Sequence, residues 1–218
     1  MAFNEAANLD AVAAEIRGAL DRVVPQGEIL IVDDGSTDGT GNIADDLART
    51  LRDVRVVHHS PNRGLGAVYR TGFTESRGDL VTFFPADGQF PASILDAFVP
   101  AMAGQDLVLG YVPRRDSLVG RVLSGAERVA YRMLLGPLPR FRGVFMVRRE
   151  ALSRVTLRSE GRGWAIVMEL LARAARGGWR MKSLPTSIRP RRSGTSKVQN
   201  VRTIWSNLLQ VVALRGRL

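Results

Sequence analysis

Apolar residues along the first half of the chain switch between helical spacing and short uninterrupted runs. The helical spacing predicts helices over residues 6–23, 39–51, 64–77 and 91–103. The uninterrupted runs predict buried strands over residues 28–32 and 80–84, and further strands are expected over residues 54–58 and 106–109. Helices that alternate with buried strands are typical of an α/β fold with a doubly wound, mostly parallel sheet, and we expect that fold class.

The second half of the chain has a different pattern, with longer arginine-rich stretches. We predict helices over residues 116–135, 165–176 and 199–214, and strands over residues 145–147, 180–184 and 187–189. The last of these helices carries apolar residues on one face and arginines beside them. That pattern is found in helices that lie in a bilayer interface, cover a sheet or form a dimer contact, and these alternatives stay open.

Length and composition indicate one globular domain. The 218 residues are enough for a sizeable core, and no repeat or low-complexity linker divides them. There is no cysteine, which excludes disulfides and thiolate metal sites and fits a cytosolic protein. No apolar run approaches the roughly 18 residues needed to span a bilayer, and the first residues do not form a signal peptide. We therefore expect a protein of the cytoplasm, or of the inner face of the cytoplasmic membrane.

Charge is distributed unevenly within the net +10 of the chain. Residues 1–110 contain 8 Lys and Arg against 16 Asp and Glu, whereas residues 111–218 contain 23 against 5. The basic half is expected to face an anionic partner, such as a lipid phosphate or a membrane surface. Nucleic-acid binding is not expected, because the basic half lacks an aromatic stacking platform and a helix-turn-helix pattern.

The most informative segment is residues 28–40, EILIVDDGSTDGT, where an apolar run ends at two adjacent carboxylates, Asp33 and Asp34. Acidic residues at the carboxyl end of a buried parallel strand lie where open α/β sheets bind ligands. Asp34 is a candidate to contact a ribose or a base, and Ser36 or Thr37 is expected to cap the following helix. The alternative is an ordinary capped turn between a strand and a helix.

This segment resembles the nucleotide-sugar-binding strand of family 2 inverting glycosyltransferases, and further motifs extend the resemblance along nearly the whole chain. They are Phe3-Asn4-Glu5, the glycine loop Asn62-Arg63-Gly64-Leu65-Gly66, Ala86-Asp87-Gly88-Gln89, and the basic loop at residues 192–197, RSGTSK. The chain is most similar to the polyprenyl-phosphate mannosyl- and glucosyltransferases of that family. The resemblance implies a GT-A fold in one domain, residues 1–198. It places a donor and metal half at 1–110, an acceptor half at 111–198, and an amphipathic helix at 199–218.

The resemblance also implies a reaction and a donor site. A hexose would move from a nucleotide-diphosphate sugar to a polyprenyl phosphate with inversion, assisted by a divalent cation, Mg²⁺ or Mn²⁺. The residues that match donor-binding positions are Glu5, Val32, Asp34, Ala86, Asp87 and Gln89. Asp87 and Gln89 also match metal-binding positions, and their oxygen ligands suit a hard cation.

A lipid-phosphate acceptor needs cationic side chains and no general base, because its oxygen is already anionic at neutral pH. By resemblance, the residues expected to serve catalysis are Asp87, Arg121, Arg132, Arg192 and Lys197. An acceptor hydroxyl is the alternative, and Glu169 would then be the nearest candidate base.

The chain departs from the family pattern in three places. Pro85 replaces an aspartate that usually stands two positions before Asp87, and no acidic residue precedes Val144-Phe145 in the stretch 140–148. The family also has a hydrophobic strand directly before the motif that Phe3-Asn4-Glu5 resembles, and we expect the true start of the protein to lie upstream. A catalytically impaired nucleotide-sugar-binding protein is therefore a further alternative. His58 and His59 have no metal-ligand spacing and are interpreted as structural or surface residues.

Overall fold

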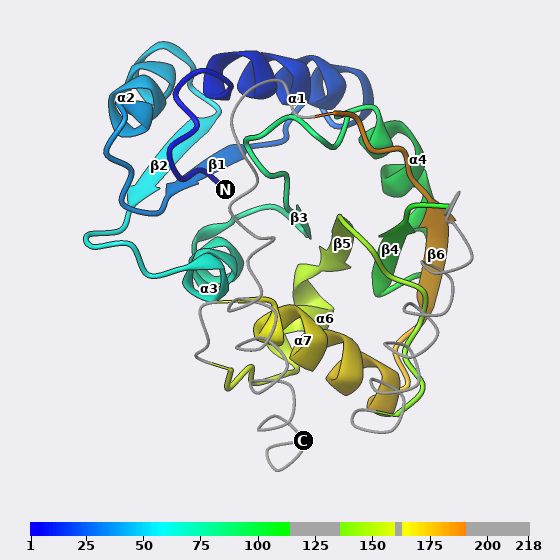
Figure 1. The fold of residues 1–218 in the computed structure, drawn as a ribbon. Helices are drawn as coiled ribbons and strands as arrows, with labels where there is room; N and C mark the ends of the chain where they lie inside the picture. Colours follow the sequence, from blue (N-terminus) through cyan, green and yellow to red (C-terminus); the bar gives the residue numbers. More distant parts are fainter. Residues whose placement is uncertain (114–135, 160–162, 191–218) are drawn as a thin grey trace.

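The computed structural model describes residues 1–113, 136–159 and 163–190, which fold into three layers (Figure 1). The helices are α1 (Leu9–Val23), α2 (Thr40–Thr50), α3 (Leu65–Glu75), α4 (Ile94–Ala101), α6 (Arg149–Ser153) and α7 (Ala165–Arg176). The strands are β1 (Ile29–Asp33), β2 (Val54–His58), β3 (Leu80–Thr82), β4 (Leu107–Tyr111), β5 (Phe145–Arg148) and β6 (Met181–Pro185). In Figure 1 the strands lie between α1 and α4 on one side and α3 and α7 on the other.

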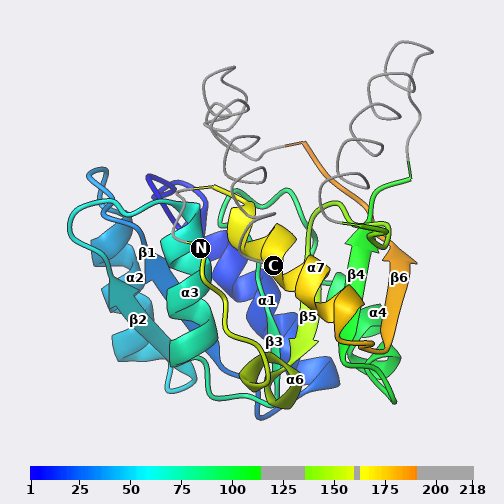
Figure 2. The same cartoon turned by 90° about the horizontal axis from the view of Figure 1, so that it is seen from below.

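The strands form two sheets, ordered β1-β2 and β3-β5-β4-β6. β1 pairs in parallel with β2, and β4 pairs in parallel with β6. β5 lies between β3 and β4 and runs antiparallel to both. Figure 2 shows the two sheets from a second direction, with β1 and β2 at one end of the molecule and β4 and β6 at the other.

Side chains of the four-stranded sheet alternate between two hydrophobic cores. Leu109 and Phe145 face α3 and α7, in a core that contains the fully buried Tyr69. Val108 and Met146, their neighbours in sequence, face α1 and α4 on the other side. Since successive strand side chains point to opposite faces, a strand covered by helices on both faces reads as a continuous apolar run.

Most of the predicted elements are confirmed, and the differences have physical causes. The orientation of β5 was not specified by the pattern, because an apolar run contains no information about strand direction. The predicted strand at 187–189 is wrong: the Arg189 N–H donates to the Gln89 carbonyl at 2.8 Å rather than to a strand, and Pro190, beside it, has no N–H. Helix α6 was not predicted. The helices predicted over 116–135 and 199–214 lie outside the described residues.

Candidate active site

The carboxyl ends of β1 and β3 are brought together by the first two residues of the chain. Residues 1–2 make backbone hydrogen bonds to residues 32–34 on one side and to residues 84–86 on the other. The turns that contain Asp34 and Asp87 are therefore held at the same edge of the fold. This is the edge at which open α/β sheets bind ligands.

The Asp34 carboxylate organises the glycine loop that begins at Asn62. One oxygen accepts the Arg63 N–H at 2.9 Å and the ring Nδ1–H of His59 at 2.7 Å. The other oxygen accepts the Gly64 N–H and the Asn62 side-chain amide, both at 2.8 Å. Asp34 is buried, so these four hydrogen bonds replace the water that an ionised carboxylate needs. Its predicted contact with the donor stays a prediction.

Gly35 lets the two loops approach each other. It has a φ of +71°, and a Cβ there would lie 2.7 Å from the Asn62 nitrogen. A larger residue would therefore push the loop of Asn62 away from Asp34 and would also strain the backbone.

The motif at residues 3–5 is clamped against the turn after β1. The Asn4 N–H donates to the Ser36 hydroxyl at 2.9 Å, and the Thr37 N–H donates to the Asn4 side-chain carbonyl at 2.8 Å. The Glu5 N–H donates to the Thr40 hydroxyl at 2.8 Å. Asn4 has a φ of +53°, a conformation that asparagine tolerates better than most residues. Two motifs more than 30 residues apart therefore form one loop cluster.

The expectation that Ser36 or Thr37 caps the following helix is wrong. Helix α2 begins at Thr40, and its N-cap residue is Gly39, which has no side chain to cap it. Instead, the Asp38 carboxylate accepts the Thr40 hydroxyl at 2.5 Å, the Thr40 N–H and the Ala6 N–H. Burial acts to raise the pKa of Asp38, but these hydrogen bonds outweigh it and hold the pKa below its usual value.

The remaining donor candidates lie around this cluster. Glu5 precedes α1, and its carboxylate accepts the Asn8 side-chain amide at 2.7 Å. Val32 and Ala86 are buried in the core, 2% and 3% exposed, so their side chains lie beneath the site rather than in it.

Asp87 and Gln89 share a tight turn after β3. Gly88 has a φ of +71°, and the Gln89 N–H donates to the Asp87 carboxylate at 3.0 Å. The Gln89 carbonyl in turn accepts the Arg189 N–H, and the Arg189 guanidinium donates to Glu15 on α1 at 3.0 Å. The turn is therefore fixed between the first helix and the segment after β6.

The ligand chemistry of this turn fits a divalent cation that arrives with a diphosphate. Asp87 offers a carboxylate and Gln89 an amide oxygen, which are ligands that hard cations prefer. Within residues 1–113, 136–159 and 163–190, no three acidic or histidine side chains gather into a group able to hold a metal ion. Mg²⁺ is commonly bound by one or two carboxylates together with substrate phosphates, so a one-carboxylate turn is compatible with such a site.

The two histidines have different surroundings. His58 lies between two carboxylates, with Nδ1 3.0 Å from Asp33 and Nε2 3.1 Å from Asp45, and these hydrogen bonds raise its pKa. His59 is buried, and besides bonding Asp34 its Nε2 lies 2.8 Å from the Thr71 hydroxyl. His59 is thus a structural residue, as expected, but one that connects Asp34 to α3. The local pattern did not indicate this role, because its two partners, Asp34 and Thr71, lie on separate elements.

Glu169 is poorly placed to act as a base. Its carboxylate is fully buried and accepts the Arg158 N–H at 2.9 Å, the Ser159 N–H at 2.7 Å and the Arg173 Nε–H at 2.8 Å. Burial acts to raise the pKa of Glu169, but the hydrogen bonds lower it overall. A buried carboxylate with a lowered pKa is hard to protonate and far from solvent. Glu169 instead supports the loop at 157–159, whose N–H groups it accepts.

The predicted acceptor residues all lie outside the described residues; they are Arg121, Arg132, Arg192 and Lys197.

Comparison with known proteins identifies the family. The model of the family described as "Glycosyl transferase family 2" matches residues 1–155, well over half of the chain. The chain belongs to glycosyl transferase family 2. It is therefore a glycosyltransferase, as the four motifs and the acidic turn had suggested.

Relatives within the family match over nearly the full chain. The chain is 34% identical to a polyprenol monophosphomannose synthase of Mycolicibacterium smegmatis, over 99% of this chain and 86% of the relative. It is 30% identical to an undecaprenyl-phosphate mannosyltransferase of Micrococcus luteus, over 99% of this chain and 96% of the relative.

Solved structures confirm the GT-A fold. One is a glucosyl-3-phosphoglycerate synthase of Mycobacterium tuberculosis in complex with Mn²⁺, UDP and phosphoglyceric acid. It has a TM-score of 0.68 at 21% identity, over 96% of this chain and 76% of that one. Another is a mannosyltransferase of Pyrobaculum calidifontis in complex with GDP-Man and Mn²⁺. It has a TM-score of 0.64 at 20% identity, over 99% of this chain and 71% of that one.

Among the described residues, no helix combines the length and the apolar character needed to cross a bilayer.

Proposed function

We propose that this glycosyltransferase moves a hexose, with mannose the first candidate, from a nucleotide-diphosphate sugar to a polyprenyl phosphate. The observation that carries the proposal is the 34% identity, over 99% of this chain, to a protein named polyprenol monophosphomannose synthase. The M. luteus relative, named for transfer of mannose to undecaprenyl phosphate, supports the same acceptor class.

On the donor side, the loop cluster of residues 3–5 and 34–40 would surround the nucleoside, and the turn of Asp87 would lie beside the diphosphate. Asp87 and Gln89 would hold a divalent cation, which supplies Lewis-acid stabilisation to the departing diphosphate. Mn²⁺ is present in both structural neighbours described above. Pro85 leaves this turn with one carboxylate, so we expect activity to depend strongly on cation concentration.

The reaction needs no general base. An anionic oxygen of the lipid phosphate attacks the anomeric carbon, the bond from that carbon to the diphosphate breaks, and the configuration inverts. Cationic side chains must hold the acceptor in line, and Arg121, Arg132, Arg192 and Lys197 are the candidates by resemblance. Glu169 is buried and occupied by hydrogen bonds, which disfavours the alternative in which a carboxylate activates an acceptor hydroxyl.

The acceptor is a lipid, so the enzyme would act at the membrane surface. The excess of Lys and Arg in residues 111–218 suits contact with anionic headgroups at the cytoplasmic face.

The test is transfer of radiolabelled sugar from GDP-mannose or UDP-glucose to undecaprenyl phosphate, with Mg²⁺ or Mn²⁺. The expected result is label in an organic-extractable lipid that mild acid releases, with no such label in the Asp87→Asn variant. Label only in water-soluble glycan would contradict the lipid acceptor. Donor binding without transfer under any of these conditions would indicate the catalytically impaired alternative.

A further inference from the structure

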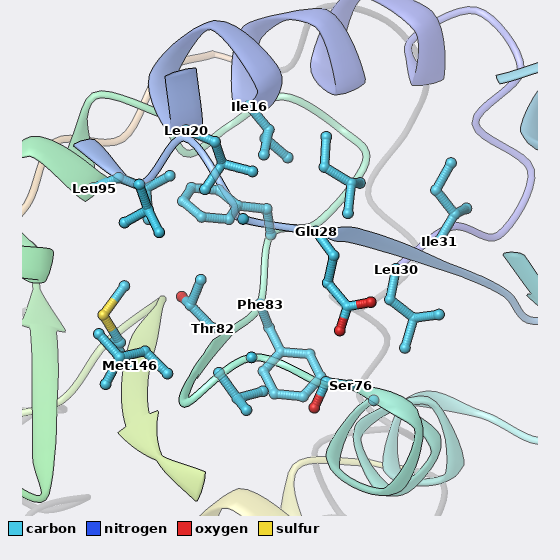
Figure 3. Close-up of a pocket in the computed structure, with 18 of the residues that line it drawn as sticks. Ile16, Leu20, Glu28, Leu30, Ile31, Ser76, Thr82, Phe83, Leu95 and Met146 are labelled. Atoms are coloured by element: carbon cyan, nitrogen blue, oxygen red, sulfur yellow. The ribbon is translucent and has the colours of Figure 1, made fainter. Parts of the chain in front are cut away.

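Glu15 on α1 holds the segment that follows the turn of Asp87. Figure 3 shows its neighbour Ile16 pointing from α1 toward an interior pocket beside β1, so the helix is held in place by its apolar face. One oxygen of the Glu15 carboxylate accepts the Ala92 N–H at 3.0 Å. Ala92 is 2% exposed and lies just before α4, so this hydrogen bond fixes one end of residues 89–92.

Arg189 holds the other end of the same segment. Its backbone N–H donates to the Gln89 carbonyl at 2.8 Å. Its guanidinium reaches Glu15, with one nitrogen 3.0 Å and 3.2 Å from the two carboxylate oxygens. Glu15 and Arg189 therefore hold the two ends of residues 89–92 and are themselves joined by an ion pair.

The middle of the segment is held from a third side. Phe90 lies against Gly143, where a Cβ would lie 2.5 Å from the Phe90 ring. The residues on either side of Gly143 are bonded to Gly110 on β4: the Arg142 N–H donates to the Gly110 carbonyl, and the Gly110 N–H donates to the Val144 carbonyl, both at 2.8 Å. Three parts of the chain that are distant in sequence therefore fix the residues directly after the proposed cation turn.

The ion pair between Glu15 and Arg189 is too exposed to contribute much to the stability of the fold. The two side chains are 27% and 46% exposed, and exposed ion pairs are worth little. Its position is more informative, because both partners also bond the backbone of residues 89–92, which include the proposed cation ligand Gln89. Since Pro85 leaves the turn with one carboxylate, cation affinity depends on how well the ligands are held in place before the cation binds.

We propose that the Glu15–Arg189 ion pair positions the cation turn: it holds Gln89 where Gln89 and Asp87 can share a divalent cation beside the nucleotide diphosphate. The inference rests on the proposed function, because it takes the cation site of the donor as given. Glu15 and Arg189 act through Gln89, so they are positioning residues and not ligands. Partners that orient a metal ligand commonly change metal affinity by roughly 10- to 100-fold.

The test measures affinity for GDP-mannose and UDP-glucose as a function of Mn²⁺ concentration in Glu15→Gln, Arg189→Gln and the double variant. Each single variant should raise the Mn²⁺ concentration needed for the half-maximal gain in affinity by about tenfold. The double variant should raise it no further, because both changes break the same contact. Arg22→Gln is the matched control: it breaks a similarly exposed ion pair between α1 and Asp96 on α4, and should leave the Mn²⁺ dependence unchanged.

The direction of the two shifts separates positioning from a plain charge effect. Loss of the positive charge of Arg189 should by itself strengthen the binding of a nearby cation, whereas loss of the negative charge of Glu15 should weaken it. Positioning predicts that both variants need more Mn²⁺. Shifts of opposite sign would overturn the proposal, and so would an equal shift in Arg22→Gln or the absence of a shift in both variants.

Amide hydrogen exchange at Ala92 provides a second readout that needs no cation. Exchange should be about tenfold faster in Arg189→Gln than in Arg22→Gln, because the ion pair keeps Glu15 at the Ala92 N–H. Equal exchange in the two variants would overturn the proposal. If Mn²⁺ had no effect on donor affinity in the wild type, the cation site and this inference would fail together. A Mn²⁺ effect in the wild type that both variants retain unchanged would overturn this inference alone.

Discussion

The turns after β1 and β3 have the same position in the fold but use their carboxylates differently. Asp34 accepts hydrogen bonds from a segment 25 to 30 residues away and fixes the loop of residues 59–64. Asp87 accepts the amide of Gln89, two residues along its own turn. The first carboxylate joins separate segments, whereas the second shapes a local turn beside a candidate cation ligand.

The difference shows that an acidic residue at the end of a buried strand has two possible uses. Four donors around a buried carboxylate replace its hydration, so such a group contributes mainly to the architecture of the site. We propose that the carboxylate in the tight turn shares a cation with the amide oxygen beside it.

The largest effect is expected at the turn of Asp87. Asp87→Ala removes the carboxylate proposed to hold the cation, and transfer should fall by about 10³-fold or more, since a bound metal contributes several kcal/mol to charge stabilisation. The melting temperature is measured alongside, so that loss of transfer in a folded protein is distinguished from unfolding. Transfer at the wild-type rate in this variant would refute the metal assignment.

Asp34→Ala should mainly reduce the stability of the fold. It leaves four hydrogen-bond donors around a buried site without their acceptor, and we expect the free energy of unfolding to fall by about 3 kcal/mol. Urea denaturation measures this loss. If Asp34→Ala unfolds like the wild type and loses only donor binding, Asp34 is a donor ligand and not the organiser of the loop.

The close approach of the two loops can be tested at a pair of glycines with positive φ. Gly35→Ala introduces a Cβ 2.7 Å from the Asn62 nitrogen, whereas Gly39→Ala introduces one with no atom within 4 Å. Both variants should lose about 1 kcal/mol to backbone strain, and Gly35→Ala should lose about 1–2 kcal/mol more to the clash. Equal losses in urea denaturation would show that the loop of Asn62 moves away without cost.

The smallest expected effect is a pH dependence at His58. Its pKa is raised in the folded protein by Asp33 and Asp45, so its contribution to stability is fully present below the unfolded pKa of about 6.5 and is lost as the pH rises through the folded pKa. The His58 side chain is 41% exposed, so the contribution should stay below about 1 kcal/mol. The difference in unfolding free energy between wild type and His58→Gln should be larger at pH 6 than at pH 9. A difference independent of pH would exclude the ionic contribution.

The sequence predicted the parts of the fold that depend on local pattern. Strand β2 and helix α7 have the predicted boundaries. In α7 the helical spacing of the apolar residues records its buried face directly. The direction of β5 was not predictable from such a pattern, since both directions bury the same side chains. The role of His59 was also missed, because its two partners, Asp34 and Thr71, lie on separate elements. The family motifs identified the loops of the site, but local pattern could not separate a carboxylate that builds a loop from one that faces a ligand.

The most direct measurement of the proposed cation site at Asp87 is donor affinity as a function of Mn²⁺ concentration, in wild type and in the isosteric variant Asp87→Asn. Both proteins should first be shown to have the same melting temperature. Mn²⁺ should raise the affinity of the wild type for GDP-mannose or UDP-glucose at least tenfold and leave that of Asp87→Asn unchanged. An equal effect of Mn²⁺ on both proteins would contradict a cation site at the turn after β3.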